Sequence, residues 1–221
     1  MTRPAPPRDP LSDRLAGCYS GVLHDVMRAA GLRNFVLPPT LRPLEPGPRM
    51  AGPVFTVSGR ATTADPHETL LAWTGLLSRA PAGHVLVIQP HDRELAFMGE
   101  LSAETLQFKG LRGALVDGGC RDVEFILELG FPVWATHYTP RDIVGAWLPT
   151  EFDQPLQIGD VQIAPGDYLC ADRDGALRVP RAQAAELVEQ AEQAMAKESL
   201  VRKAILEGLD PQQAYLRHGK F

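Results

Sequence analysis

The apolar residues of the first 135 positions alternate between helical and strand spacing. Apolar side chains from Leu11 to Ala30 recur at helical spacing, which predicts one amphipathic helix that ends at Gly31. Residues 84–89 form a continuous apolar run, which is typical of a strand covered on both faces. Strands are also expected at residues 54–59, 97–98, 114–116 and 131–135, and helices from residue 65 through 76, from 99 to 110 and from 121 to 130. This alternation predicts an α/β fold.

Beyond residue 141 the pattern changes to short β segments bounded by Gly, Pro or Asp. Residues 172–175, Asp-Arg-Asp-Gly, suit a tight hairpin turn. A long helix over residues 182–206 and a short one over 211–216 are expected to follow. The expected strands are 142–147, 155–157, 161–163, 168–171 and 176–179. The sequence therefore predicts an α/β region that leads into a β-rich segment and a helical C-terminal extension.

Candidate chemistry gathers at two glycine turns that open helices, Gly99 and Gly118-Gly119. If both follow strands, they share the rim at the carboxyl ends of the sheet, where ligands bind in open α/β folds. Arg121 and Asp122 follow the second turn. An arginine binds a carboxylate through two parallel hydrogen bonds, and an aspartate can hold a hard divalent cation. The alternative to this binding site is that Asp122 only caps its helix and that Arg121 is solvated.

Two further pairs of polar residues have a functional and a simpler interpretation. His24 and Asp25 could be catalytic, but polar groups on the flank of a helix are more often solvated or capping. Glu198 and Arg202 lie one helical turn apart in the long helix, as an ion pair at that spacing would. Neither pair identifies a site by itself.

Composition excludes several classes of protein. The chain has 221 residues, of which 44% are hydrophobic, and a net charge of −5, so we expect no nucleic-acid partner. Cys18, Cys120 and Cys170 are widely spaced and odd in number, which indicates neither a disulfide framework nor a zinc site and favours the reducing cytoplasm. Residues 1–10, rich in proline and arginine, predict a flexible arm rather than a membrane segment.

Several motifs together resemble the RraA-like family. This family groups the class II 4-hydroxy-4-methyl-2-oxoglutarate/4-carboxy-4-hydroxy-2-oxoadipate aldolases with the regulator of ribonuclease E activity. The motifs are Gly99-Glu100-Leu101, residues 116–122, 129–135, 51–57 and 165–175, and Lys197-Glu198. The resemblance implies a layered α/β/β sandwich of the swivelling-domain type over residues 11–180. It further implies that residues 181–221 form helices that pack on a neighbouring subunit.

The resemblance also implies a role for individual residues. Twenty residues separate Glu100 from Arg121-Asp122, as in the aldolases, although these usually carry aspartate at the first position. Asp122 would bind the metal directly, with Glu100 and Glu198 holding it through water. Arg121 would bind the substrate, helped by backbone amides of Gly99, Glu100 and Leu101. Arg121, Asp122, Glu100 and Glu198 would thus be the catalytic residues.

The implied activity is a lyase that depends on Mg²⁺ or Mn²⁺. It would cleave a 4-hydroxy-2-oxo diacid to pyruvate and a 2-oxo acid, and would decarboxylate oxaloacetate through the same pyruvate enolate. Glu198 would reach the site of an adjacent subunit, so a homotrimer or homohexamer is implied. The alternative is a non-catalytic regulator that binds a protein partner, such as an RNA-degrading endonuclease. All four proposed catalytic residues are present, which favours the enzyme.

Overall fold

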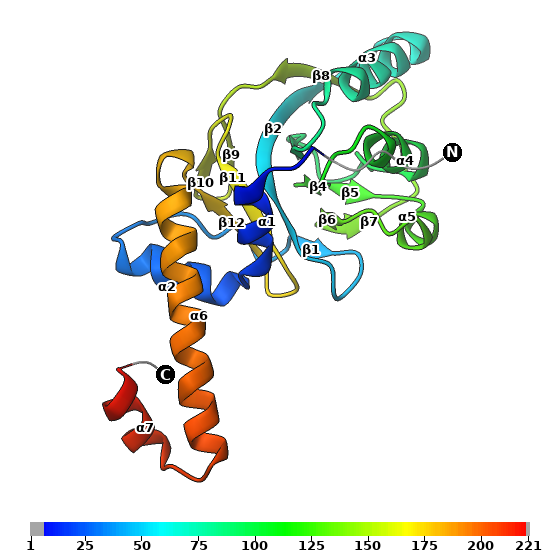
Figure 1. The fold of residues 1–221 in the computed structure, drawn as a ribbon. Coiled ribbons are helices and arrows are strands. Elements are labelled where there is room, and N and C mark those ends of the chain that lie inside the picture. The colour runs from blue at the N-terminus through cyan, green and yellow to red at the C-terminus, as the bar shows by residue number, and fades with distance from the viewer. Residues whose placement is uncertain (1–6, 220–221) are drawn as a thin grey trace.

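A computed structural model describes residues 7–219 as a mixed α/β fold (Figure 1). Most of the predicted arm, residues 1–6, lies outside the described residues. The helices are α1 Pro10–Gly17, α2 Ser20–Ala29, α3 Pro66–Arg79, α4 Glu100–Phe108, α5 Val123–Leu129, the 3₁₀ helix η1 Arg181–Gln183, α6 Ala184–Leu206 and α7 Pro211–His218. The strands are β1 Arg42–Pro43, β2 Met50–Ala61, β3 Val85–Gln89, β4 Gly113–Val116, β5 Gly119–Cys120, β6 Val133–Ala135, β7 His137–Tyr138, β8 Trp147–Phe152, β9 Leu156–Ile158, β10 Val161–Ile163, β11 Tyr168–Ala171 and β12 Ala176–Val179.

One large sheet organises the chain. Its strand order is β1-β6-β4-β3-β2-β11-β12, with β8 also paired to β2. The centre, β2-β3-β4-β6, is parallel, while β1, β8, β11 and β12 pair antiparallel with their neighbours. The long strand β2 curves through the middle of the molecule (Figure 1). It pairs with β3 of the parallel part on one side and with β11 of the antiparallel part on the other. β9 with β10 and β5 with β7 form two smaller pairs.

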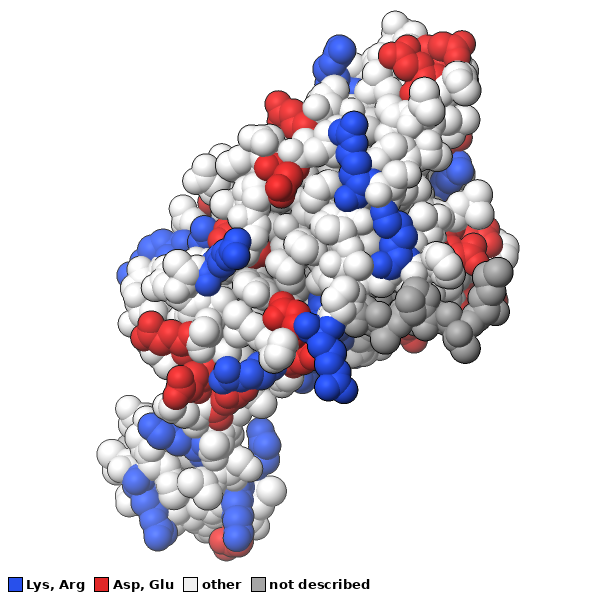
Figure 2. All heavy atoms as spheres, turned by 45° about the horizontal axis from the view of Figure 1, so that its top comes forward, with Lys and Arg blue, Asp and Glu red and all other residues white. Residues whose placement is uncertain are grey.

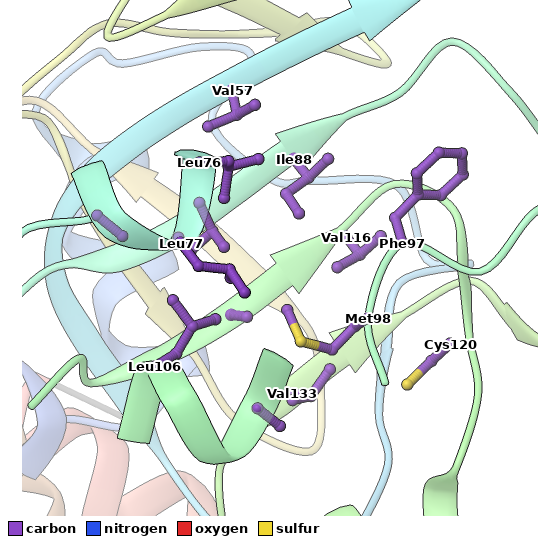
Figure 3. Packing of buried hydrophobic residues seen from close by; sticks show 14 of the residues in the cluster. Val57, Leu76, Leu77, Ile88, Phe97, Met98, Leu106, Val116, Cys120 and Val133 are labelled. Carbon is purple, nitrogen blue, oxygen red and sulfur yellow. The ribbon is translucent and has the colours of Figure 1, made fainter. Parts of the chain in front are cut away.

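The sheet is covered on both faces, as the apolar run of β3 predicts. Leu86 and Ile88 pack in one cluster with side chains of α3, α4 and α5, and Figure 3 shows Ile88 among these buried side chains, which include Leu76 and Leu77 of α3. Val85 and Val87 point to the other side and pack with the β9–β10 hairpin. A third cluster joins α1, α2 and α6 to β11 and β12. The predicted layered α/β/β arrangement is therefore confirmed, and α6 and α7 extend from it (Figure 1).

The predicted single helix over residues 11–30 is wrong, because the chain breaks at Cys18 into α1 and α2. Cys18 is extended, with ψ 137°. The next helix starts at Ser20, whose backbone N–H donates to Asp172 Oδ2 at 2.7 Å and whose hydroxyl donates to Asp172 Oδ1 at 2.7 Å. This cap comes from the turn between β11 and β12, which is distant in the sequence. The apolar spacing alone therefore gave no sign of the break.

Two other expected strands differ in the described structure. Residues 142–146 form a loop, and the strand expected there starts at Trp147. Phe97 and Met98 lie outside the named strands, although the Phe97 N–H donates to the Gly119 carbonyl at 2.9 Å. Ala96 also forms an isolated parallel bridge with Gly119. Gly99 thus reaches the rim of the sheet on a loop that pairs with β5, and not at the end of a strand of its own.

Charged side chains of both signs are spread over the face shown in Figure 2. On the face shown in Figure 2, Lys and Arg lie scattered among Asp and Glu and do not merge into one continuous basic surface. Between residues 7 and 219, no helix is both long enough and apolar enough to cross a membrane.

Candidate active site at the starts of α4 and α5

Arg121 and Asp122 lie between the short strand β5 and helix α5. Gly118 and Gly119 leave no room for side chains, since a Cβ would meet Phe97 Cδ2 at 2.8 Å and the Leu95 carbonyl at 2.6 Å respectively. The Arg121 N–H donates to the Met98 carbonyl at 2.9 Å. These contacts bind the loop before α4 to the segment before α5. The first turns of the two helices are thereby held side by side.

Asp122 has an unusual backbone conformation, and its carboxylate does not cap its own helix. Its φ of 55° and ψ of 37° are left-handed, which aspartate tolerates better than most residues. Asp122 Oδ2 instead accepts a hydrogen bond of 3.2 Å from the backbone N–H of Glu100. The interpretation of Asp122 as a simple helix cap is therefore wrong. The Asp122 carboxylate, at the start of α5, is thus directed at the backbone N–H of Glu100, the first residue of α4.

Gly99 allows this close approach. It is the N-cap residue of α4, and its φ of −147° is extended, so the glycine is not needed for backbone conformation. A Cβ there would lie 2.7 Å from Asp122 Oδ2. The first turn of α4 is hydrogen-bonded to α3, because the Trp73 indole N–H donates to the Ser102 hydroxyl at 2.9 Å. Asp122 already accepts from the Glu100 N–H, and the other N–H groups of that turn, with the helix dipole, favour an anion.

Arg121 is held between two carboxylates. Its Nε lies 3.4 Å from Asp122 Oδ2, and its Nη1 donates to Asp142 Oδ2 at 3.3 Å. Asp142 Oδ1 accepts from the Val144 N–H at 3.1 Å, which fixes the aspartate in its loop. The sequence interpretation missed Asp142 because it placed this residue in a strand. The signal available was the preceding Thr-Pro-Arg, a turn-forming context for an aspartate.

These groups line a cavity of about 580 Å³. The structure brings Gly99, Glu100, Leu101, Arg121 and Asp122 together there, as the sequence predicts. The apolar wall includes Trp73, Phe97 and Met98, and side chains of α3 and of residues 142–144 complete the lining. A second hollow of about 320 Å³ lies against Arg121 and Asp122, beside Tyr138 to Pro140. One wall of the larger cavity is thus charged and the other apolar.

Glu198 lies elsewhere in the protomer. It lines a separate hollow of about 540 Å³ between α2 and α6, together with His24, Asp25 and Arg202. The Tyr19 hydroxyl donates a hydrogen bond to Glu198 Oε2. Burial, and after it the hydrogen bond to Glu198, raise the pKa of Tyr19 from 10.0 to about 12. Within one protomer, Glu198 therefore does not join Arg121 and Asp122.

Two other polar residues of the Arg121 segment have structural roles. Asp117 is buried and accepts hydrogen bonds from Gln89 at 2.6 Å and from Arg93 at 3.0 Å. Burial, with a further contribution from the nearby charge of Asp122, raises the pKa of the Cys120 thiol to about 12. A thiol with so high a pKa is a poor nucleophile near neutral pH. Arg121 and the carboxylates are therefore the groups of this segment that remain available for chemistry.

The donor set suits a cation that keeps most of its water. No group of three or more His, Cys, Asp or Glu side chains among the described residues could enclose a metal ion. Asp122, however, is 38% exposed and accepts its single hydrogen bond on Oδ2. Mg²⁺ is commonly bound through one or two carboxylates, with water and substrate oxygens completing the shell. Asp122, with Glu100 in the same cavity, fits that requirement.

Comparisons with known proteins identify the family. The RraA-like family, described as Aldolase/RraA, matches residues 20–178. A protein from Halalkalibacterium halodurans named "Putative 4-hydroxy-4-methyl-2-oxoglutarate aldolase" is 28% identical over 190 residues, which are 84% of this chain and 85% of that protein. Protein DlpA of Legionella pneumophila is 26% identical over 92% of this chain, but the match spans only 33% of DlpA.

A solved structure supports the same assignment. Streptomyces coelicolor RraAS2, described as an unusual member of the RNase ES inhibitor RraA protein family, superposes with a TM-score of 0.78 at 29% identity. The superposition covers 91% of this chain and 98% of RraAS2. The relatives thus include proteins named as aldolases and proteins named as RNase inhibitors. On the extent of the family match, the chain belongs to the RraA-like family of aldolases and RraA proteins.

Proposed function

We propose that this protein is a divalent-metal-dependent lyase that cleaves a 4-hydroxy-2-oxo acid to pyruvate and a second carbonyl compound. One observation carries the proposal: the first turn of α4, the Arg121 guanidinium and the Asp122 carboxylate meet on one wall of the same cavity. A 2-oxo carboxylate needs an anion-binding group beside a metal-binding carboxylate. The relative's name makes 4-hydroxy-4-methyl-2-oxoglutarate, a diacid, the first substrate to test.

Each residue has a distinct task in this reaction. Arg121 and the N–H groups at the start of α4 bind the substrate carboxylate and 2-oxo oxygen. Asp122 holds Mg²⁺ or Mn²⁺, with Glu100 supporting it through water. The bound ion supplies Lewis-acid polarisation of the 2-oxo group. Arg121 adds positive charge beside the oxygen on which negative charge develops as the C3–C4 bond breaks.

The proton transfers follow from the same arrangement. Glu100 takes the proton of the C4 hydroxyl, and the electron pair of the C3–C4 bond moves to the pyruvate part as an enolate. Glu100 then gives this proton to C3, which releases pyruvate, while C4 leaves as a carbonyl. Loss of CO₂ from oxaloacetate produces the same enolate, so oxaloacetate decarboxylation is the expected side activity.

The C-terminal helices supply the second part of the proposal. α6 and α7 project from the sheet (Figure 1) and carry exposed apolar side chains, namely Leu200 at 57%, Leu206 at 80%, Tyr215 at 51% and Leu216 at 67% exposure. Exposed apolar surface of this kind often marks an interface. We infer that residues 181–221 pack on a neighbouring protomer in a homotrimer or homohexamer. Glu198 then acts at the neighbour's site.

The test of the lyase activity is pyruvate release from 4-hydroxy-4-methyl-2-oxoglutarate and from oxaloacetate, with Mg²⁺, Mn²⁺ or EDTA. Asp122→Asn keeps the shape of the side chain but removes its charge, and activity should fall at least a hundredfold. Asp153→Asn is the matched control, because Asp153 also has a left-handed φ, of 54°, and is exposed outside the cavity. Inactivity of the wild-type protein with every metal would refute the lyase and direct attention to a protein-binding regulator.

The shared site has its own test. Asp122→Ala and Glu198→Ala protomers, each inactive alone, should regain activity when they are unfolded together and refolded as mixed oligomers. Mixing restores complete sites only if the two residues come from different protomers. Failure to restore activity in mixed oligomers of confirmed size would show that Glu198 does not act across the interface.

A further inference from the structure

The cavity at the starts of α4 and α5 is acidic apart from Arg121. The described residues of one protomer that line it include the carboxylates of Glu100, Asp122 and Asp142 and the single cation Arg121. Arg121 lies 3.4 Å from Asp122 and 3.3 Å from Asp142, and it binds the 2-oxo end of the substrate in the proposed reaction. Within their bounds, α4 and α5 carry glutamates but no Lys or Arg. A diacid substrate therefore needs a second cation from another element, because a buried carboxylate without a partner is unfavourable.

Such a cation lies on α6, one turn beyond Glu198. Arg202 follows Glu198 by four residues, so the two side chains project from the same side of the helix. Both line the hollow of about 540 Å³ between α2 and α6. Burial and the hydrogen bond to Glu198 raise the pKa of Tyr19, whereas the positive charge of Arg202 opposes this rise, so the guanidinium lies near the hydroxyl that binds Glu198. Any contact that brings Glu198 to a neighbouring site brings Arg202 there as well.

The spacing of Glu198 and Arg202 along α6 suits the length of a diacid. One turn of a helix advances by about 5.4 Å. In a 4-hydroxy-2-oxo diacid, three C–C bonds separate C2 from the carbon of the C4 carboxylate, and these span about 4 Å. When Glu198 holds metal-bound water beside the 2-oxo group, Arg202 therefore lies within reach of the C4 carboxylate. A guanidinium binds such a group through two parallel hydrogen bonds.

We propose that Arg202 of one protomer binds the C4 carboxylate of the substrate held in the cavity of the neighbouring protomer, and thereby selects diacids over monoacids. This inference rests on the proposed lyase and its shared site, and it names the residue that determines specificity there. Arg202 contacts the substrate but takes no part in proton transfer or metal binding. Its loss should therefore weaken the use of a diacid without preventing enolate formation.

The test compares two substrates that differ in one group at C4. 4-Hydroxy-4-methyl-2-oxoglutarate carries a carboxylate and releases two molecules of pyruvate, whereas 4-hydroxy-4-methyl-2-oxopentanoate carries a second methyl group and releases pyruvate and acetone. In Arg202→Gln, the ratio of kcat/KM for the diacid to kcat/KM for the monoacid should fall at least about tenfold, the scale of a lost charge-assisted hydrogen bond. Both substrates are measured on one preparation, so the ratio does not depend on the fraction of assembled protein. An unchanged ratio would overturn the proposal.

A matched variant on α6 separates substrate contact from general charge effects. Lys203→Gln removes the same charge at the next position, where Lys203 Nζ lies 3.9 Å from Glu207 Oε1 and the side chain does not line the hollow. It should leave the ratio of the two substrates unchanged. Equal effects of Arg202→Gln and Lys203→Gln would show that the overall charge of α6 sets the preference, and would overturn the proposal.

Mixed oligomers test whether Arg202 acts across the interface. Arg202→Gln protomers are unfolded and refolded together with an excess of Asp122→Ala protomers, which are inactive but carry Arg202. Each active site then combines Asp122 of one protomer with Arg202 of its neighbour, so the wild-type ratio should return. A ratio that stays at the value of Arg202→Gln alone would overturn action from the neighbouring protomer.

A further measurement distinguishes failure of this inference from failure of the lyase itself. Exchange of the pyruvate methyl protons with deuterium from solvent, followed by NMR, requires the enolate but no C4 substituent. Arg202→Gln should keep the metal-dependent exchange of the wild type while its kcat/KM for the diacid falls. An equal loss of exchange and cleavage would overturn the specific role of Arg202 and leave the lyase intact. Absence of exchange in the wild type refutes the lyase, and the inference falls with it.

Discussion

Replacement of Gly99 by alanine should disable the site while leaving the fold nearly unchanged. Gly99 has an extended backbone, so alanine adds no strain in φ. Its Cβ, however, would lie 2.7 Å from Asp122 Oδ2 and 3.3 Å from Arg121 Nε. The carboxylate is half-exposed and at the end of a short side chain, so it can rotate away. The helix positions need not move.

The size of the effect follows from these distances. A contact of 2.7 Å is about 0.7 Å shorter than the 3.4 Å at which ordinary contact begins, so Asp122 must shift by a comparable distance. That shift breaks the 3.2 Å hydrogen bond from the Glu100 N–H and separates Asp122 from Arg121. A misplacement of about 1 Å can lower catalysis about a hundredfold, so kcat/KM should fall at least tenfold. The unfolding free energy should change by less than about 1 kcal/mol.

The assay is metal-dependent pyruvate release, measured beside urea unfolding. Gly75→Ala in α3 is the control, because a Cβ there would meet no atom within 4 Å. Alanine in a helix should raise stability by up to about 1 kcal/mol without altering turnover. Unchanged kcat/KM in Gly99→Ala would refute the role of this close approach. A loss of several kcal/mol of stability would refute the claim that only the site is affected.

Three further predictions concern binding, stability and pH. Arg121→Lys should raise the KM for the 2-oxo acid at least tenfold in steady-state kinetics, because lysine cannot form two parallel bonds; an unchanged KM would exclude the guanidinium from substrate binding. Asp167→Ala should lower the urea unfolding free energy by about 3 kcal/mol, because the buried carboxylate accepts from Arg178 at 2.7 Å; a loss below about 1 kcal/mol would contradict this. The pKa of Tyr19 is raised from 10.0 to about 12 by burial and then by Glu198, so its contribution to stability is complete below pH 10 and is lost as pH rises to about 12. Wild type should therefore lose stability more steeply than Tyr19→Phe over that range, and parallel curves would contradict the assignment.

The candidate site could be predicted in part because its residues lie near helix starts that the sequence marks. The glycines before the helices at residues 99 and 118–119 pointed to Arg121 and Asp122, and the resemblance to the RraA-like family added Glu100 to the groups that line the cavity. Asp142 could not be found in this way. It contacts Arg121 because the loop of residues 142–146 folds over the cavity, and no periodic pattern encodes that contact.

The sequence by itself determined the elements whose signals are local. The apolar run of β3 predicted burial on both faces, and the hairpin strands near residues 161–163, 168–171 and 176–179 were found at their observed bounds. Such patterns arise because the period of a helix or strand fixes which face each side chain occupies, and a buried face requires apolar side chains. Only the tertiary structure decided the break at Cys18, the pairing of Ala96 with Gly119 and the separation of Glu198 from Asp122 within a protomer. Each of these depends on contacts between distant segments, whose energies are set by packing and hydrogen bonding across the fold and not by neighbours in the chain.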